Sequence, residues 1–233
     1  MKDNQTRRNF FGIIGTAGFG LAAAGGMISG CTSGSTPSDT ENPETMLGQY
    51  FHRFSEILTA FRDEELDKIG QAADMAAECF MSGGKLYSTL GGHLFQKDGG
   101  DTANDRIGNP VLFNRDTEDM KTGDFLVTMG ASQAKDAQEK GIKVVGWTSP
   151  FRRKGDTPPL GLEKPQDMIL EEVCDVTIEC HVPYTDGILY SEKIHVRPIP
   201  GSGQMTLIFY WTLTAAIVER LAEKGKNLTV AGA

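Results

Sequence analysis

Short apolar runs separated by polar or helix-prone stretches restrict the fold of this chain more than any other feature. They lie at residues 85–90, 108–114, 124–129, 141–148 and 175–179, and several are apolar throughout, without alternation. Uniformly apolar runs are typical of parallel strands that are covered on both faces. Strands separated by helical segments favour a doubly wound sheet over a sandwich. We therefore predict an α/β fold: a single doubly wound, three-layer domain with a parallel sheet.

Helical patterns lie on both sides of these runs. Apolar residues recur at helical spacing over 46–62 and again over 64–81, where Ser82-Gly83-Gly84 ends the pattern. Residues 132–140 are polar and helix-prone. The last helix is predicted over 204–224, with these residues facing the core: Ile208, Trp211, Thr212, Ala215, Ala216 and Leu221.

The first 31 residues resemble a targeting segment. Arg7 and Arg8 precede a mildly apolar, Gly- and Ala-rich stretch that ends in Ile28-Ser29-Gly30-Cys31, which resembles a lipoprotein box. A plain N-terminal anchor helix is the alternative, because the stretch is long enough to cross a bilayer. We expect export by the twin-arginine route, acylation of Cys31 and a periplasmic or other extracytoplasmic place on the membrane surface. Residues 32–45 are polar and predict a flexible tether, which leaves 46–233 as the folded domain.

Charge and cysteine content exclude several classes of partner and site. The net charge of -8 argues against a nucleic-acid partner, since proteins bind the phosphate backbone through clustered Lys and Arg side chains. Besides Cys31 the chain has Cys79, Cys174 and Cys180, and this odd number predicts buried thiols, with a Cys174–Cys180 bridge as the alternative. The four histidines show no metal-ligand spacing, so we expect no metal site and no cofactor.

The ligand site of such a sheet is expected at the carboxyl ends of its strands, where the strand order reverses. Four loops would meet there, at 91–94, at 130–133, at 148–149 and after Glu179. Gly91 and Gly92, which follow the first strand, therefore indicate a ligand loop. A tight turn without a ligand is the alternative.

Four segments together resemble the sugar isomerase (SIS) domain family, especially its phosphosugar-binding branch: "GGKLYSTLGGH", "GDFLVTMG", "AKDAQEKGIKVVGWTS" and "CDVTIECHVPYTDGIL". The resemblance covers most of the chain after the tether. It implies a roughly five-stranded parallel sheet between helices, assembly into dimers or tetramers, and a phosphorylated sugar as ligand. In that family hydroxyl groups and backbone N–H groups at helix N-termini hold the phosphate.

The resemblance, together with the hydroxyl groups near the expected crevice, implies a set of ligand-binding residues: Ser88, Thr89, Gly91, Gly92, His93, Thr128, Gly130, Ser132, Gln133, Thr148, Ser149 and Ser202. Two departures stand out. Leu94 replaces a serine, and Thr128-Met129-Gly130-Ala131 replaces the Ser-x-Ser-Gly loop. Losing two charge-assisted hydrogen bonds, at about 1.5–3 kcal/mol each, would weaken binding by roughly two orders of magnitude or more.

An aldose–ketose isomerase would need a base that works near pH 7. The candidates near the crevice are His93, His181, Asp186, Glu192 and His195, of which His93 and Asp186 are our predicted catalytic residues. Asp186-Gly187 also fits a plain turn, and His93 a turn cap. Three hypotheses follow. They are a membrane-tethered SIS-like domain that binds a carbohydrate derivative, an active phosphosugar isomerase, and a structural or interaction module that has lost the site.

Overall fold

The computed structural model describes residues 45–91, 112–149, 168–183, 186–189 and 199–226. All of them belong to one compact unit, Thr36–Ala233. Several predictions lie outside the described residues: the targeting segment with Cys31, nearly all of the tether, and Gly92, His93, Leu94, Glu192 and His195.

The described residues form a five-stranded sheet in the order β2-β1-β3-β4-β5, in which every neighbouring pair is parallel. The strands are β1 (Leu86–Ser88), β2 (Phe113–Asn114), β3 (Phe125–Thr128), β4 (Lys143–Thr148) and β5 (Val176–Glu179). Each falls within one of the five predicted apolar runs. The buried, non-alternating pattern of β3 is that of a central parallel strand. The predicted α/β fold with a parallel sheet is confirmed.

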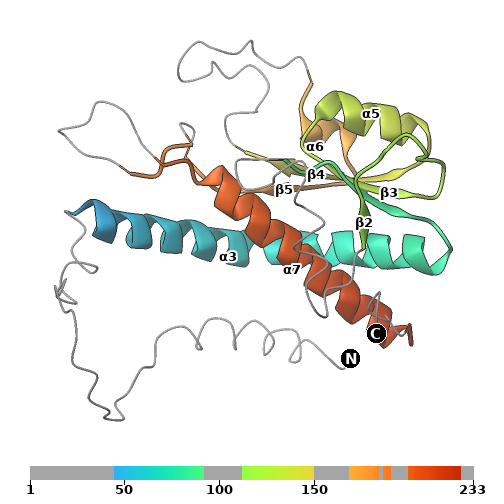
Figure 1. The fold of residues 1–233 in the computed structure, drawn as a ribbon, viewed down its shortest axis with the longest axis horizontal. Helices are drawn as coiled ribbons and strands as arrows, with labels where there is room; N and C mark the ends of the chain where they lie inside the picture. The colour runs from blue at the N-terminus through green and yellow to red at the C-terminus, as the bar shows by residue number, and fades with distance from the viewer. Residues whose placement is uncertain (1–44, 92–111, 150–167, 184–185, 190–198, 227–233) are drawn as a thin grey trace, which may run out of the picture. The chain divides into compact units, whose positions relative to one another are not determined.

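Helices cover both faces of this sheet (Figure 1). On one face, α3 (Met46–Met81) and α7 (Ser202–Glu223) pack in the larger core cluster against strand residues such as Phe125, Val145 and Ile178. On the other, α5 (Ala131–Glu139) and the short α6 (Leu170–Val173) pack against Tyr87, Leu126 and Val144. Successive side chains along a strand therefore pack into the cores on opposite faces of the sheet, which explains the continuous apolar runs.

The two helices predicted before the first strand are one continuous helix, so the break at residue 63 was wrong. α3 runs for 36 residues from a Thr45 cap, whose Oγ1 accepts a hydrogen bond from the Gly48 N–H at 3.0 Å. No proline or glycine lies near residue 63 to stop it, and Arg62 and Asp63 form a surface ion pair at 2.7 Å. The helix ends where Gly83, at φ 85°, turns the chain toward β1.

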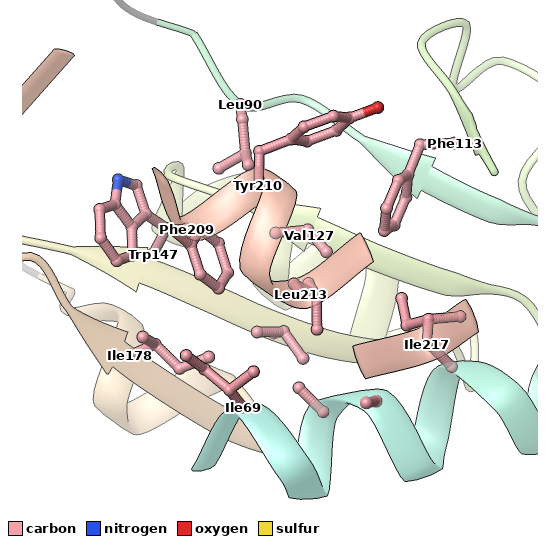
Figure 2. Close-up of a cluster of buried hydrophobic side chains, with 14 of the residues drawn as sticks. Ile69, Leu90, Phe113, Val127, Trp147, Ile178, Phe209, Tyr210, Leu213 and Ile217 are labelled. Carbon is pink, nitrogen blue, oxygen red and sulfur yellow. The ribbon is translucent and has the colours of Figure 1, made fainter. Parts of the chain in front are cut away.

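The predicted inward face of α7 was correct only in part. Leu221 is fully buried, and Ile208, Trp211 and Ala216 pack half-buried against the larger core. Ala215 is exposed, and the centre of the buried face is formed by Met205, Phe209, Leu213 and Ile217, which were not predicted. α7 is apolar on several sides, so its composition alone did not determine its rotation. Packing against the sheet determines this rotation (Figure 2): the Trp147 ring stacks on the Phe209 ring, with the ring centroids 4.4 Å apart. The Trp147 Nε1–H also donates to Thr206 Oγ1 at 2.8 Å.

By length and composition, α7 is the one helix among the described residues that could cross a membrane. Half of its most apolar stretch is buried inside the protein. Its position against the sheet is that of a core helix.

The cysteines beyond the targeting segment are free thiols, so the alternative Cys174–Cys180 bridge is wrong. The buried-thiol interpretation is confirmed for Cys79 and Cys180, whereas Cys174 is half-buried. Burial raises the pKa of Cys79 to about 11 and the pKa values of Cys174 and Cys180 to about 12. These thiols therefore stay protonated at neutral pH and are poor nucleophiles.

A buried aspartate fixes the start of the central strands. Asp124 is 1% exposed, and its two carboxylate oxygens accept hydrogen bonds from the Lys85 N–H at 2.8 Å and the Lys121 N–H at 2.9 Å. Asp124→Ala should lower the free energy of unfolding by about 3 kcal/mol, because two part-buried backbone N–H groups lose a charged acceptor. Urea denaturation would measure it. Asp119→Ala, at an exposed position of the same loop, is the control, and equal losses in both variants would contradict this role.

Candidate functional site

The strand order reverses between β1 and β3, because β2 lies on one side of β1 and the later strands follow on the other. In doubly wound sheets the crevice outside the carboxyl ends of two such strands is the usual ligand site. Here β1 ends at Ser88 and β3 ends at Thr128. The reversal therefore brings together the carboxyl ends of two strands whose loops the sequence predicted to meet; of the 91–94 loop, only Gly91 belongs to the described residues.

Three predicted ligand residues meet at this reversal and form what we call the hydroxyl cluster: Thr89, Thr128 and Gln133. The two threonine Oγ1 atoms lie 2.9 Å apart, and each lies 2.7 Å from Gln133 Oε1. The Gly130 N–H donates to Thr128 Oγ1 at 3.0 Å. Two hydroxyl protons can serve only two of the three contacts, so the cluster has more than one arrangement of donors. A ligand with its own hydroxyl groups could exchange partners with it.

Helix α5 begins directly at the hydroxyl cluster. Its N-cap is Gly130, which provides no side-chain cap, and its first turn closes with the Ala134 N–H donating to the Gly130 carbonyl. The N–H groups of residues 131–133 precede that bond and have no intrahelical acceptor. Together with the helix dipole, such groups favour an anion. Ser132 is exposed in this turn.

The other predicted hydroxyls near the sheet end are buried. Ser88 Oγ accepts a hydrogen bond from the Leu90 N–H at 3.4 Å. Gly91, the next residue after Leu90, is half-buried. Thr148 and Ser149, at the end of β4, are each 5% exposed. Ser149 Oγ makes no hydrogen bond within the described part of the chain. A buried hydroxyl without a partner is uncommon and calls for an explanation, such as a bound ligand or water.

Asp186 and Ser202 lie together at the start of α7. Asp186 Oδ1 accepts from the Gly201 and Ser202 N–H groups at 3.2 and 2.9 Å, and Oδ2 accepts from Ser202 Oγ at 2.9 Å. The carboxylate therefore lies where a helix N-terminus would hold an anion. This matches the turn interpretation of Asp186. Its catalytic role and the ligand role of Ser202 remain predictions.

Substitutions at Asp186 should separate capping from catalysis. Asp186 has φ 59°, a left-handed conformation that Asn tolerates and Ala does not. We expect Asp186→Ala to lower the free energy of unfolding by about 2 kcal/mol through the lost cap and the strain, and Asp186→Asn to cost clearly less. Chemical denaturation measures both variants. Equal stability of the two variants would contradict the capping role.

A second polar centre joins α3 to the segment after β5, and the sequence analysis missed half of it. His181, one of the candidate bases, has its Nε2 3.1 Å from Glu65 Oε1, and Glu65 is 2% exposed. The Lys68 ammonium lies 2.9 Å from Glu65 Oε2. Glu65 occupies a helical position 116 residues from His181, so no local pattern indicated the pairing.

The two groups of this pair have shifted pKa values in opposite directions. Burial pushes the pKa of Glu65 upward, but hydrogen bonds from His181, Lys68 and the Glu179 backbone outweigh it and leave that pKa lowered. The hydrogen bond to Glu65 raises the pKa of His181, against an opposing effect of burial, and neighbouring carboxylates add to the rise. The pair is therefore most stable as a carboxylate and an imidazolium.

The fold and the polar site define the chain as a doubly wound α/β protein with a cluster of hydrogen-bonded hydroxyl groups at its topological switch point. No family model matches the sequence. A UPF0309 protein of Streptomyces griseus subsp. griseus is 24% identical over 217 residues, which are 77% of this chain and 85% of the relative. A UPF0309 protein of Streptomyces coelicolor is 22% identical over 215 residues, 76% and 84% of the two chains.

Among solved structures, the phosphoheptose isomerase GmhA from Neisseria gonorrhoeae matches with a TM-score of 0.42 and 14% identity, over 76% of this chain and 97% of that one. These likenesses cover most of the chain. None of them by itself defines its activity.

Proposed function

We propose that this chain is a SIS-like domain that binds a small anionic carbohydrate derivative, such as a phosphorylated sugar, outside the carboxyl ends of β1 and β3. The hydroxyl cluster beside the N-terminus of α5 carries this proposal. Its groups can both donate and accept hydrogen bonds, as recognition of sugar hydroxyls requires. The N–H groups of the first turn of α5 would hold the anionic group.

The buried Ser149 hydroxyl supports the same site. It lies at the carboxyl end of β4, next to β3 in the sheet, and has no partner among the described residues. A ligand oxygen that reached it would remove the cost of an unsatisfied buried hydroxyl, about 1–3 kcal/mol. Ser149→Ala should therefore weaken ligand binding while leaving the free protein as stable or slightly more so.

The structural or interaction module remains the second candidate, because two observations favour it. The members of the hydroxyl cluster satisfy one another, and Asp186 fills the start of α7 with the protein's own carboxylate. A crevice that needs no ligand for its hydrogen bonds can persist after a site has been lost.

Thermal unfolding of the full-length chain separates these two functions. The ligands to test are sugar phosphates, their unphosphorylated parents and inorganic phosphate. A ligand at a hundred times its dissociation constant stabilises the folded state by about 2.7 kcal/mol, which raises the melting temperature measurably. We expect a rise with sugar phosphates that exceeds any rise with inorganic phosphate or the parent sugars. If none of these ligands raises the melting temperature, the structural or interaction module is the function that remains.

We also propose that the chain is exported by the twin-arginine route and held at the membrane surface by an acyl group on Cys31. The support is the sequence pattern of the first 31 residues. Metabolic labelling with a fatty acid should mark the wild-type chain and not Cys31→Ala. Labelling of both would reject acylation at this residue.

Assembly into a homo-oligomer is proposed on separate grounds. Leu47 and Phe51 on α3 and Leu207 on α7 are large apolar side chains that are 36–52% exposed. Light scattering should give a dimer or tetramer for the wild type and a smaller particle for Phe51→Glu. A monomeric wild type would reject the proposal.

A further inference from the structure

A separate cavity of about 570 Å³ lies between α3 and the connection from β5 to α7. Its lining includes no member of the hydroxyl cluster and consists of Arg53, Glu56, Ile57, Ala60, His181, Pro183 and Ile188. Its volume falls in the range of small-molecule sites. Four lining residues lie on one face of α3 at helical spacing, and the apolar ones form a wall along which a carbon chain could lie.

The connection that forms the other wall is strained. Among the described residues of this connection, the non-glycine residues with left-handed backbone are His181 at φ 56°, Asp186 at φ 59° and Ile199 at φ 64°. A β-branched residue such as Ile199 rarely adopts this conformation. Such strain tends to gather at binding and catalytic sites.

Acidic groups outnumber basic ones around His181 among the described residues. The carboxylates of Glu64, Glu65 and Glu179 all act on its charge. Glu56 in the cavity lies 2.9 Å from the Arg53 guanidinium, and Lys68 pairs with Glu65. Four carboxylates thus face two permanent cations. Around His181 this excess of carboxylates favours a positive charge over an anion, while Glu56 and Arg53 are the members of the group that line the cavity.

The geometry of His181 leaves one ring nitrogen for a ligand. In the neutral imidazole, the contact of Nε2 with Glu65 Oε1 at 3.1 Å places the proton on Nε2 and the lone pair on Nδ1. Nδ1 lies 4.0 Å from Oε2 of Glu64, a 66% exposed carboxylate outside the cavity lining, and this distance is too long for a hydrogen bond. Two acceptors at this separation can both receive hydrogen bonds from one ammonium group, which has three N–H donors.

We propose that this cavity binds a primary amine, whose ammonium group bridges His181 Nδ1 and the Glu64 carboxylate while its carbon chain lies against Ile57, Ala60 and Ile188. Glu65 is a positioning residue: it fixes the tautomer and orientation of His181 without touching the ligand. This site is independent of the anion site proposed between β1 and β3, and either could exist without the other.

Binding of the amine is coupled to a proton. The ligand needs the lone pair of Nδ1, so it competes with protonation of His181, which Glu65, Glu179 and Glu64 favour and burial opposes. Below the pKa of His181, affinity for the amine should fall about tenfold for each pH unit.

The test follows the His181 ring by NMR in the full-length chain, with its signal assigned through His181→Gln. Ethylammonium chloride is the probe, and tetramethylammonium chloride at equal ionic strength is the control, because it has no N–H donor. We expect ethylammonium to lower the apparent pKa of His181 and tetramethylammonium to leave it unchanged. Glu64→Gln should weaken ethylammonium binding about tenfold. Glu78→Gln, at another exposed position of α3, should not.

Equal shifts of the His181 pKa by the two cations would mean that the salt only screens the charges around the ring, and this result would overturn the proposal. So would an unchanged pKa with ethylammonium, or a Glu64→Gln variant that binds the probe as the wild type does. These outcomes are independent of the sugar-phosphate screen, so failure of one site leaves the other standing.

Discussion

Replacing Glu65 with alanine should lower the free energy of unfolding by about 3–5 kcal/mol, a large part of the stability of a domain of this size. The carboxylate is 2% exposed and accepts hydrogen bonds from Lys68 and His181, while the Glu179 backbone also bonds to it. Its removal would leave a buried imidazole and a buried N–H group without an acceptor. Urea denaturation near pH 6, followed by circular dichroism, measures the loss.

Glu64→Ala is the matched control for this experiment. It removes the same side chain one position earlier on α3. There the carboxylate is 66% exposed and lies 4.0 Å from His181 Nδ1, beyond hydrogen-bond distance. Surface changes of this kind usually have small effects. Comparable losses for Glu64→Ala and Glu65→Ala would show that the buried pair does not anchor α3.

The same pair should make stability depend on pH, with the sign set by the two pKa shifts. The pKa of His181 is raised above its ordinary 6.5, so its contribution is complete below about pH 6.5 and is lost as pH rises through the folded-state value. The pKa of Glu65 is lowered below its ordinary 4.5, so its contribution is complete above about pH 4.5 and is lost as pH falls further. The pair therefore stabilises the fold most between these values. Glu65→Ala should flatten the stability profile on both sides of this window.

Thr128→Val should reduce affinity for a sugar phosphate at least tenfold. Thr128 is fully buried, and valine has nearly the same shape without the hydroxyl. The change removes the oxygen that accepts from the Gly130 N–H and contacts both Thr89 and Gln133, so the hydroxyl cluster loses its centre. A lost neutral hydrogen bond and an unsatisfied neighbour together are worth about 2 kcal/mol or more. Isothermal titration calorimetry with the best ligand of the thermal screen measures the change.

Thr122→Val is the control at the opposite end of the sheet. Its Oγ1 donates to the Lys140 carbonyl at 2.7 Å, before the amino end of β3, whereas Thr128 lies at the carboxyl end of that strand. We expect it to alter stability slightly and affinity not at all. Unchanged affinity in Thr128→Val would place the ligand, if one binds, away from the hydroxyl cluster.

Much of the sheet was predictable because strands buried on both faces need apolar side chains at every position. The apolar runs around Phe125–Thr128 and Lys143–Thr148 therefore indicated strands without knowledge of their neighbours. Helix boundaries were less well determined. The pattern around residue 63 had no breaker but was interpreted as two helices, and the apolar composition of α7 left its rotation open.

The two polar centres differ in how far the sequence pointed to them. Thr89, Thr128 and Gln133 follow strand ends, and parallel strands end at one edge, so their meeting was expected before the structure. Glu65 sits among the apolar positions of a helix, where a carboxylate gives no local signal of its partner. Only the packing of α3 beside β5 brings it to His181.

The sequence by itself determined the class of fold, the approximate place of each strand and the edge of the sheet where polar residues gather, because these depend on local periodicity and on the direction of the chain. The tertiary structure alone decided the rotation of α7, the capping role of Asp186 and the pairing of Glu65 with His181. The physical reason is that each of these rests on contacts between distant segments, where burial and hydrogen-bond geometry, and not local preference, select the partner.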